Sequence, residues 1–197
     1  MAERTAEIKR KTKETDITLS LSLDGTGEFD VSTGIGMLDH MLEQLARHGR
    51  FDLTVKAKGD IDRDTHHLTE DVGIVLGQAL DQALGERRGI TRFGDAIIPL
   101  DETLALVALD LSGRAHADVA LEFDRELVGE LPTENLWHLL ESFAREARMT
   151  LHVRLLSGTN DHHRAEAVFK GLARALRAAV SIDPAAAGDV PSTKDKL

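Results

Sequence analysis

Hydrophobic and polar residues alternate along several short segments of the chain, a pattern that predicts half-buried strands. The clearest is Ile17–Leu23, in which Ile and Leu occupy every second position between Thr and Ser. Because the turn-forming sequence Asp24–Gly27 follows, we expect Glu28–Ser32 to return beside it as a hairpin. The same alternation predicts strands at Arg4–Arg10, Phe51–Ala57, Arg92–Ile98, Thr103–Leu109, Arg114–Leu121 and Met149–Leu155.

Four longer segments carry apolar residues at the three- and four-residue spacing of an amphipathic helix. Gly49 is placed to end the first of them, and Pro132 is placed to start the third. The predicted helices are Met37–His48, His66–Leu84, Asn135–Ala147 and His162–Val180.

The order of these elements occurs twice: three strands, a helix, a strand and a helix. The residues repeat as well, since Asp39–Arg47 matches Trp137–Arg145 at an offset of 98 residues. Two amphipathic helices can cover one face of a four-stranded sheet. We therefore predict an α+β fold with an internal duplication, in which each half is a four-stranded sheet with two helices on one face and the helices pack between two outer sheets. Residues 1–90 and 91–182 form the halves, and residues 183–197 form a C-terminal tail.

Composition narrows the class of protein. With 197 residues, of which 42% are hydrophobic, the chain can bury a core of its own. The net charge of -10 argues against nucleic acid or an anionic membrane as the main partner. The absence of Cys excludes disulfides and thiolate metal sites. Since no apolar run approaches the length of a membrane span and Met1–Glu14 is polar, we expect a cytoplasmic protein.

The motif His-His-x-x-Glu occurs twice, at residues 66–70 and 162–166. On a helix the first His and the Glu of each copy lie one turn apart on one face, while the second His, His67 or His163, points about 100° around the helix. Each copy can therefore hold one metal ion and offer its second His to another. Imidazole and carboxylate ligands suit hard to borderline divalent ions. The repeat adds an upstream pair, so the candidate ligands are His40, His66, His67, Glu70, His138, His162, His163 and Glu166.

Other polar residues carry no such signal by themselves. Gly34 and Gly36 are interpreted as turning the chain into a helix, because a third Gly and a Lys-Ser/Thr are missing from a phosphate loop. Asp60–Asp64 is interpreted as a solvated loop, because it lacks the Gly and final Glu of a calcium loop. Taken singly, the remaining polar candidates are interpreted as solvated or frayed surface residues: Glu14, Arg92, Arg114 and Ser192–Lys194.

Several segments together resemble the imidazoleglycerol-phosphate dehydratase family, from about Arg4 to Lys194. They are Thr33–Leu42, both His-His-x-x-Glu motifs, Asp110–Arg114 and Pro191–Lys194. Some details depart from the family pattern, among them the two middle residues of the first motif, Leu68 and Thr69, which the metal hypothesis leaves free. Ala115 stands where Pro commonly follows Gly-Arg, and Asp195 stands where Gly commonly follows Ser-Thr-Lys, which places a negative charge beside an expected phosphate contact.

The resemblance implies a hydro-lyase of histidine biosynthesis that dehydrates imidazole glycerol phosphate to imidazole acetol phosphate, with two Mn²⁺ ions per active site. It implies that one metal is bound by His40, His66, Glu70 and His163 and the other by His67, His138, His162 and Glu166. It implies substrate contacts from Glu14, Gln44, Arg92, Arg114, Ser192 and Lys194, the last two in the tail. Our candidates for proton transfer are Glu14 and Glu166, with Glu166 as a pure ligand the rival interpretation. A closed homo-oligomer of about 24 subunits, with sites at subunit contacts, is also implied.

Two other classes of function stay open at this point. A binuclear metallohydrolase could use the same ligands, but it would release phosphate from phosphoesters. A non-catalytic metal-binding shell protein would not need Arg92, Arg114 or Lys194.

Overall fold

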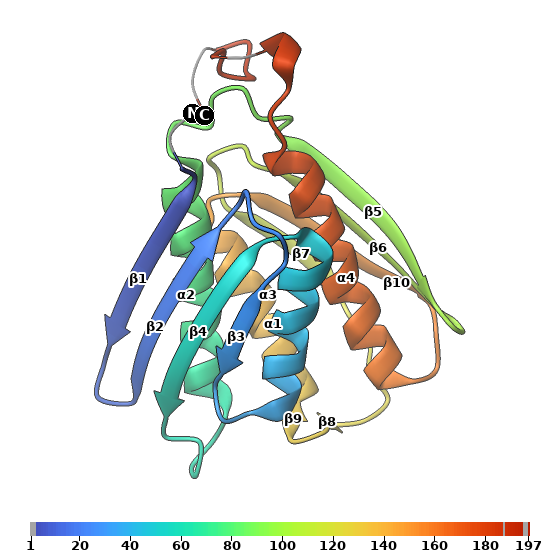
Figure 1. The fold of residues 1–197 in the computed structure, drawn as a ribbon. Coiled ribbons are helices and arrows are strands. Elements are labelled where there is room, and N and C mark those ends of the chain that lie inside the picture. Colours follow the sequence, from blue (N-terminus) through green and yellow to red (C-terminus); the bar gives the residue numbers. More distant parts are fainter. Residues whose placement is uncertain (1–2, 187, 195–196) are drawn as a thin grey trace.

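The computed structural model describes residues 3–186, 188–194 and 197, and these form two four-stranded sheets with four helices between them (Figure 1). The first half contains β1 (Thr5–Lys11), β2 (Thr15–Ser22), β3 (Phe29–Ser32), α1 (Gly36–Gly49), β4 (Asp52–Gly59) and α2 (His66–Leu84). The second half contains β5 (Phe93–Leu100), β6 (Thr103–Asp110), β7 (His116–Ala120), α3 (Thr133–Glu146), β10 (Thr150–Ser157) and α4 (Asp161–Val180). A small ribbon of β8 (Leu127–Val128) and β9 (Leu131–Pro132) precedes α3, and the 3-10 turn Pro184–Ala186 follows α4.

The two halves have the same topology. Their strand orders are β1-β2-β4-β3 and β5-β6-β10-β7. In each half the third strand runs parallel to the fourth, with Val31 opposite Val55 and Val119 opposite Val153. Some corresponding elements have equal lengths, since β4 and β10 each have 8 residues and α1 and α3 each have 14. The predicted fold class is confirmed.

The hairpin expected at Asp24–Gly27 is wrong. β3 does not return beside β2 but crosses to the far edge of the sheet and pairs with β4. The physical reason is a contact with Asp52 at the start of β4. Its Oδ1 accepts the backbone N–H groups of Thr26, Gly27 and Glu28 at 2.8, 3.0 and 2.9 Å, which ties the loop to β4.

Close helix contacts bring the histidine motifs to one end of the molecule. Gly73 and Gly77 lie one turn apart on α2, and a Cβ atom at either would come within 2.7 Å of the carbonyl oxygen of Leu139 or Phe143 on α3. Only glycine permits this approach of α2 to α3, while α1 packs against α4 in the same layer. The starts of all four helices lie at the lower end in Figure 1. None of the described helices combines the length and apolar character needed to cross a lipid bilayer.

Candidate metal-binding and anion-binding sites

The second His-His-x-x-Glu motif begins α4 and is joined there by His40 from α1. Oδ1 of Asn160 accepts the backbone N–H groups of His162 and His163 at 2.9 and 3.4 Å, which caps the helix. Nε2 of His162 lies 3.2 Å from Oε2 of Glu166, and Nε2 of His40 lies 3.7 Å from the same oxygen. Donor atoms of His40, His162 and Glu166 all lie within 4.8 Å of one another, so a single divalent ion could join them.

Glu166 is ionised in this setting. Burial alone would raise the pKa of its carboxyl, but the Lys170 ammonium, 2.7 Å from Oε1, and the neighbouring imidazoles hold that pKa below its usual value. One oxygen of Glu166 therefore faces Lys170 and the other faces the two histidines. A carboxylate held in this way is suited to bind a metal ion, which favours the ligand interpretation of Glu166 over proton transfer.

The first motif begins α2 and is joined by His138 from α3. The rings of His66 and His138 meet edge to face at a centroid distance of 4.7 Å, and Nε2 of His66 lies 3.9 Å from Oε2 of Glu70. Nδ1 of His66 lies 3.2 Å from Oδ1 of Asn135, a buried residue whose Nδ2 donates to Oγ1 of Thr65. Because the amide oxygen can only accept, Nδ1 carries the proton and Nε2 stays free.

The second histidine of each motif has a carboxylate within hydrogen-bond distance of its Nδ1. Nδ1 of His67 lies 3.2 Å from Oδ2 of Asp60, and Nδ1 of His163 lies 2.9 Å from Oε2 of Glu102. These hydrogen bonds raise the pKa of both histidines, and the one from His163 lowers the pKa of Glu102. Histidines that bind metal commonly donate their other ring N–H to such a group. The arrangement fits His67 and His163 as ligands through Nε2.

Glu14 lies at the tip of the β1–β2 hairpin, close to the first motif. Its carboxylate is within 4.8 Å of donor atoms of Asp60 and His67. The hairpin is fixed to α2 by Oγ1 of Thr15, which donates to Oδ2 of the buried Asp71 at 2.5 Å. Asp71 directly follows the Glu of the motif, so this bond holds Glu14 over the start of α2.

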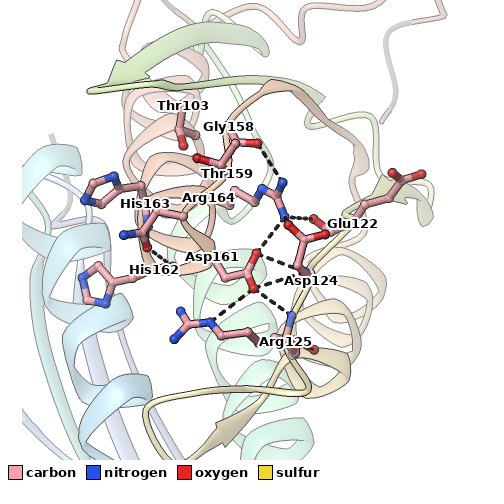
Figure 2. A network of polar contacts seen from close by, with 12 residues as sticks. Thr103, Glu122, Asp124, Arg125, Gly158, Thr159, Asp161, His162, His163 and Arg164 are labelled. Carbon is pink, nitrogen blue, oxygen red and sulfur yellow. Dashed lines mark hydrogen bonds and ion pairs between the residues drawn. The ribbon is translucent and has the colours of Figure 1, made fainter.

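A buried ion pair supports the second motif from the other side of the helix. The Asp161 side chain, which is 1% exposed, accepts the backbone N–H of Asp124 at 3.2 Å and of Arg125 at 2.9 Å. Nη1 of Arg164 donates to Oδ1 of Asp161 at 2.7 Å. Figure 2 shows the two histidines of the motif pointing away from this network. The network therefore fixes the start of α4 while leaving both imidazoles accessible.

Two basic residues predicted to contact the substrate, Arg92 and Arg114, lie beside the C-terminal tail. A shallow pocket is lined by Arg92, Arg114, Pro191, Ser192, Thr193 and Lys194. Nε and Nη2 of Arg92 donate to the two oxygens of Asp110 at 2.7 and 3.0 Å, and Nη1 donates to the carbonyl oxygen of Pro191 at 2.7 Å. The tail thus lies against Arg92, and the group could bind an anion. Asp195 lies outside the described residues.

This anion pocket and the histidine groups lie at opposite ends of one chain. The backbone N–H of Arg92 donates to the carbonyl oxygen of Ala179 near the end of α4, whereas His162 is at its start. At 1.5 Å per residue, these positions are about 25 Å apart. Gln44 lies on the histidine side, one turn after His40 on α1, where Oε1 is 3.1 Å from Nε2 of His48.

One chain does not assemble either of the ligand sets implied by the resemblance. His40 lies with His162 and Glu166, rather than with His66 and Glu70. His138 likewise lies against the first motif rather than the second. Among the described residues, the groups of three or more candidate donors are His40, His162 and Glu166, and Glu14, Asp60 and His67.

Comparison with known proteins decides the family. The sequence model described as imidazoleglycerol-phosphate dehydratase matches residues 33–176. The chain belongs to the imidazoleglycerol-phosphate dehydratase family. An imidazoleglycerol-phosphate dehydratase of Xanthobacter autotrophicus is 59% identical over 98% of both chains. One of Dehalococcoides mccartyi is 56% identical over 100% of this chain and 99% of its own.

Solved structures of imidazoleglycerol-phosphate dehydratases share the fold. The crystal structure from Staphylococcus aureus has a TM-score of 0.83 and 35% identity, covering 91% of this chain and 99% of its own. The structure from Pyrococcus furiosus has a TM-score of 0.83 and 38% identity, covering 96% of this chain and 100% of its own.

Sequence reasoning missed several residues that support the histidine motifs of this dehydratase family member. Asn135 and Glu102 carry no motif, and each reaches its histidine only after distant elements pack. Asp60 was interpreted as part of a solvated loop, but it is half-buried and bonded to His67. Asp161 directly precedes the second motif, and only its burial shows that it supports the helix start rather than binding a ligand.

Proposed function

We infer that the protein is a hydro-lyase that dehydrates imidazoleglycerol phosphate in histidine biosynthesis. The observation that carries this inference is 59% identity to a named dehydratase over 98% of both chains. The alternatives of a metallohydrolase or a non-catalytic shell protein are not favoured, because the related chains and the solved structures bear the dehydratase name. A cytoplasmic location stays a prediction.

Two Mn²⁺ ions per active site are proposed as the cofactors. Support comes from the donor set of imidazoles and carboxylates, and from the three histidines whose Nδ1 is already occupied: His66, His67 and His163. When bound, such ions would act as Lewis acids that stabilise negative charge on the imidazole of the substrate. The hydroxyl can then leave from the carbon beside the ring.

Glu14 is proposed as the general base. Within the described residues its carboxylate accepts no hydrogen bond, and it lies beside His67 and Asp60 at the expected metal site. A carboxylate without a competing partner can take the proton from the substrate carbon next to the one that loses its hydroxyl. The rival candidate, Glu166, is already engaged by Lys170 and two histidines.

The complete site is proposed to form between subunits. A phosphorylated imidazole with a three-carbon chain spans about 10 Å at the bond lengths of organic molecules. It cannot bridge the roughly 25 Å along α4 between His162 and Ala179, whose carbonyl oxygen accepts the backbone N–H of Arg92. This separation supports the proposal that a second copy brings its pocket of Arg92, Arg114, Ser192 and Lys194 to the histidines of the first.

The outer faces of the two sheets also support a homo-oligomer. On the first sheet, β2 presents Thr18 and Ser20, whereas the corresponding positions of β6 on the second sheet are Leu106 and Ala108. Ile97, opposite Leu106, is 57% exposed. An apolar sheet face of this kind is typical of a surface that another protein chain covers. A closed assembly of about 24 subunits remains our proposal.

The experiment that tests the proposed function is a product assay with the purified protein, Mn²⁺ and imidazoleglycerol phosphate. We expect imidazole acetol phosphate to form while all phosphate stays organic. Release of inorganic phosphate would instead indicate the metallohydrolase, and the absence of either product would contradict catalysis.

A further inference from the structure

The internal duplication extends to a pair of glutamates in the two edge hairpins. β2 and β6 both have 8 residues, and each begins with a buried threonine, Thr15 or Thr103. A glutamate precedes each of them, so Glu14 and Glu102 occupy equivalent positions at an offset of 88 residues. Both lie near the second histidine of the motif in their own half.

The two glutamates nevertheless have different partners. Oε2 of Glu102 lies 2.9 Å from Nδ1 of His163, and Oε1 accepts the backbone N–H groups of Thr159 and Asn160 at 3.0 and 2.8 Å. In the first half, Nδ1 of His67 faces the carboxylate of Asp60 instead. This leaves the Glu14 carboxylate uncommitted among the described residues.

A single backbone position explains the difference. The first residue after β4 is Asp60, and the first residue after the corresponding strand, β10, is Gly158. Gly158 has a φ of +137°, and a Cβ atom there would lie 2.4 Å from Oγ1 of Thr103. No side chain fits this space, so an aspartate cannot support His163 from this position. Glu102 reaches the same imidazole nitrogen from the hairpin.

We propose that Glu102 is a positioning residue that keeps the proton of His163 on Nδ1, so that Nε2 is free to bind a metal ion. It does for His163 what Asp60 does for His67. The inference rests on the metal site proposed above. Glu102 and Asp60 thus have the same role, each toward the second histidine of its own half. Because Asp60 fills this role in the first half, the carboxylate of Glu14 is left to contact the substrate.

The test compares Glu102→Gln with Glu102→Ala by Mn²⁺ titration calorimetry on the metal-free, full-length protein. The Gln oxygen can keep both backbone hydrogen bonds, but its NH₂ group then faces Nδ1 of His163. The ring must accept there, which moves the proton to Nε2 and blocks the ligand atom. We expect Glu102→Gln to lose about 10- to 100-fold in Mn²⁺ affinity, and more than Glu102→Ala.

A merely structural role gives the opposite order. Glu102→Gln would then bind Mn²⁺ like the wild type, and Glu102→Ala would be weaker because two backbone hydrogen bonds are lost. Equal or tighter Mn²⁺ binding by Glu102→Gln than by Glu102→Ala overturns the inference. Thermal unfolding of the metal-free variants checks the fold, and only Glu102→Ala should have a lowered midpoint.

Two matched variants separate this inference from the proposed function. Glu14→Gln, the repeat counterpart, should keep wild-type Mn²⁺ affinity while losing dehydration activity. Asp60→Asn should weaken Mn²⁺ binding as Glu102→Gln does, because its amide can likewise face Nδ1 of His67. Wild-type protein that binds no Mn²⁺ would overturn the metal site and this inference together. Normal wild-type binding with unaltered Glu102→Gln would overturn this inference alone.

Discussion

The imidazole rings of His40 and His162 stack at a centroid distance of 5.5 Å, although the two residues come from different halves of the duplication. The contact follows from the packing of α1 against α4, and the packing of α2 against α3 pairs His138 with His66 in the same way. The family resemblance assigns His40 to the metal of His66 and Glu70. If that assignment holds, the His66 and Glu70 that share a metal ion with His40 must belong to another copy of the chain.

Two Mn²⁺ ions per chain are expected at saturation. Changing His66→Ala or His162→Ala should lower the metal content and abolish dehydration, because a missing imidazole opens the coordination of the ion. Elemental analysis of the dialysed protein measures the first effect. At most one ion per chain, together with an active His162→Ala variant, would contradict the two-metal proposal.

Metal removal should dissociate the assembly. If each ion joins ligands of neighbouring subunits, its binding free energy also stabilises their contact. Light scattering should therefore show smaller particles after strong chelation and larger ones after Mn²⁺ is restored. An unchanged particle mass with and without metal would mean that the subunits associate through other surfaces.

The tail should contribute to phosphate binding. Lys194→Ala removes one charged contact, worth about 1.5 kcal/mol, so the apparent affinity for the substrate should fall about tenfold. Metal content should not change, and a phosphate-free imidazole analogue should lose less affinity. Deleting Ser192–Leu197 provides the second variant. Unaltered affinity for the phosphorylated substrate after this deletion would show that the tail has no binding role.

Asp52 should stabilise the loop before β3 in a pH-dependent way. Backbone N–H groups, that of Glu28 above all, hold the pKa of the Asp52 carboxyl below its ordinary value of 3.8. A lowered folded-state pKa contributes stability above the unfolded pKa, and this contribution is lost as the pH falls through the folded pKa. We expect Asp52→Asn to cost about 1 kcal/mol at neutral pH and progressively less below about pH 4.

Denaturant unfolding at several pH values measures this difference. Asp62→Asn, a change of the same kind at an exposed loop position, is the control and should be neutral. A cost of Asp52→Asn that stays constant down to pH 3 would contradict the assignment to the charged carboxylate.

Local patterns in the sequence predict most of the fold, because strands and helices express themselves in neighbouring residues. The alternation of Ile17–Leu23 and the start of α2 at His66 are examples. The path after Asp24–Gly27 could not be predicted locally, since it depends on Asp52, which is distant in the sequence. Strands β5 and β7 begin later than expected, and Arg92 and Gly113 just before them have positive φ.

The candidate site could likewise be predicted only in part from the sequence. The repeated motif is visible in the sequence, and the structure places Arg92 and Arg114 beside the tail. The partners of the histidines are not visible, because Asn135 meets His66 only through the packing of α3 on α2. The assignment of each residue to a metal or to the substrate stays a prediction.

We propose that the two His-His-x-x-Glu motifs of one chain belong to different active sites, each completed by a neighbouring chain. The most direct measurement is the dehydration activity of mixed assemblies made from two inactive variants, His66→Ala and His163→Ala, dissociated and reassembled together with Mn²⁺. If the two motifs of one site come from different chains, about one quarter of the sites receive both intact motifs by random assortment. We predict activity near that fraction of wild type, and none from a mixture of His66→Ala with Glu70→Ala. A mixture of His66→Ala and His163→Ala that stays inactive although large assemblies form would show instead that both motifs of a site come from one chain.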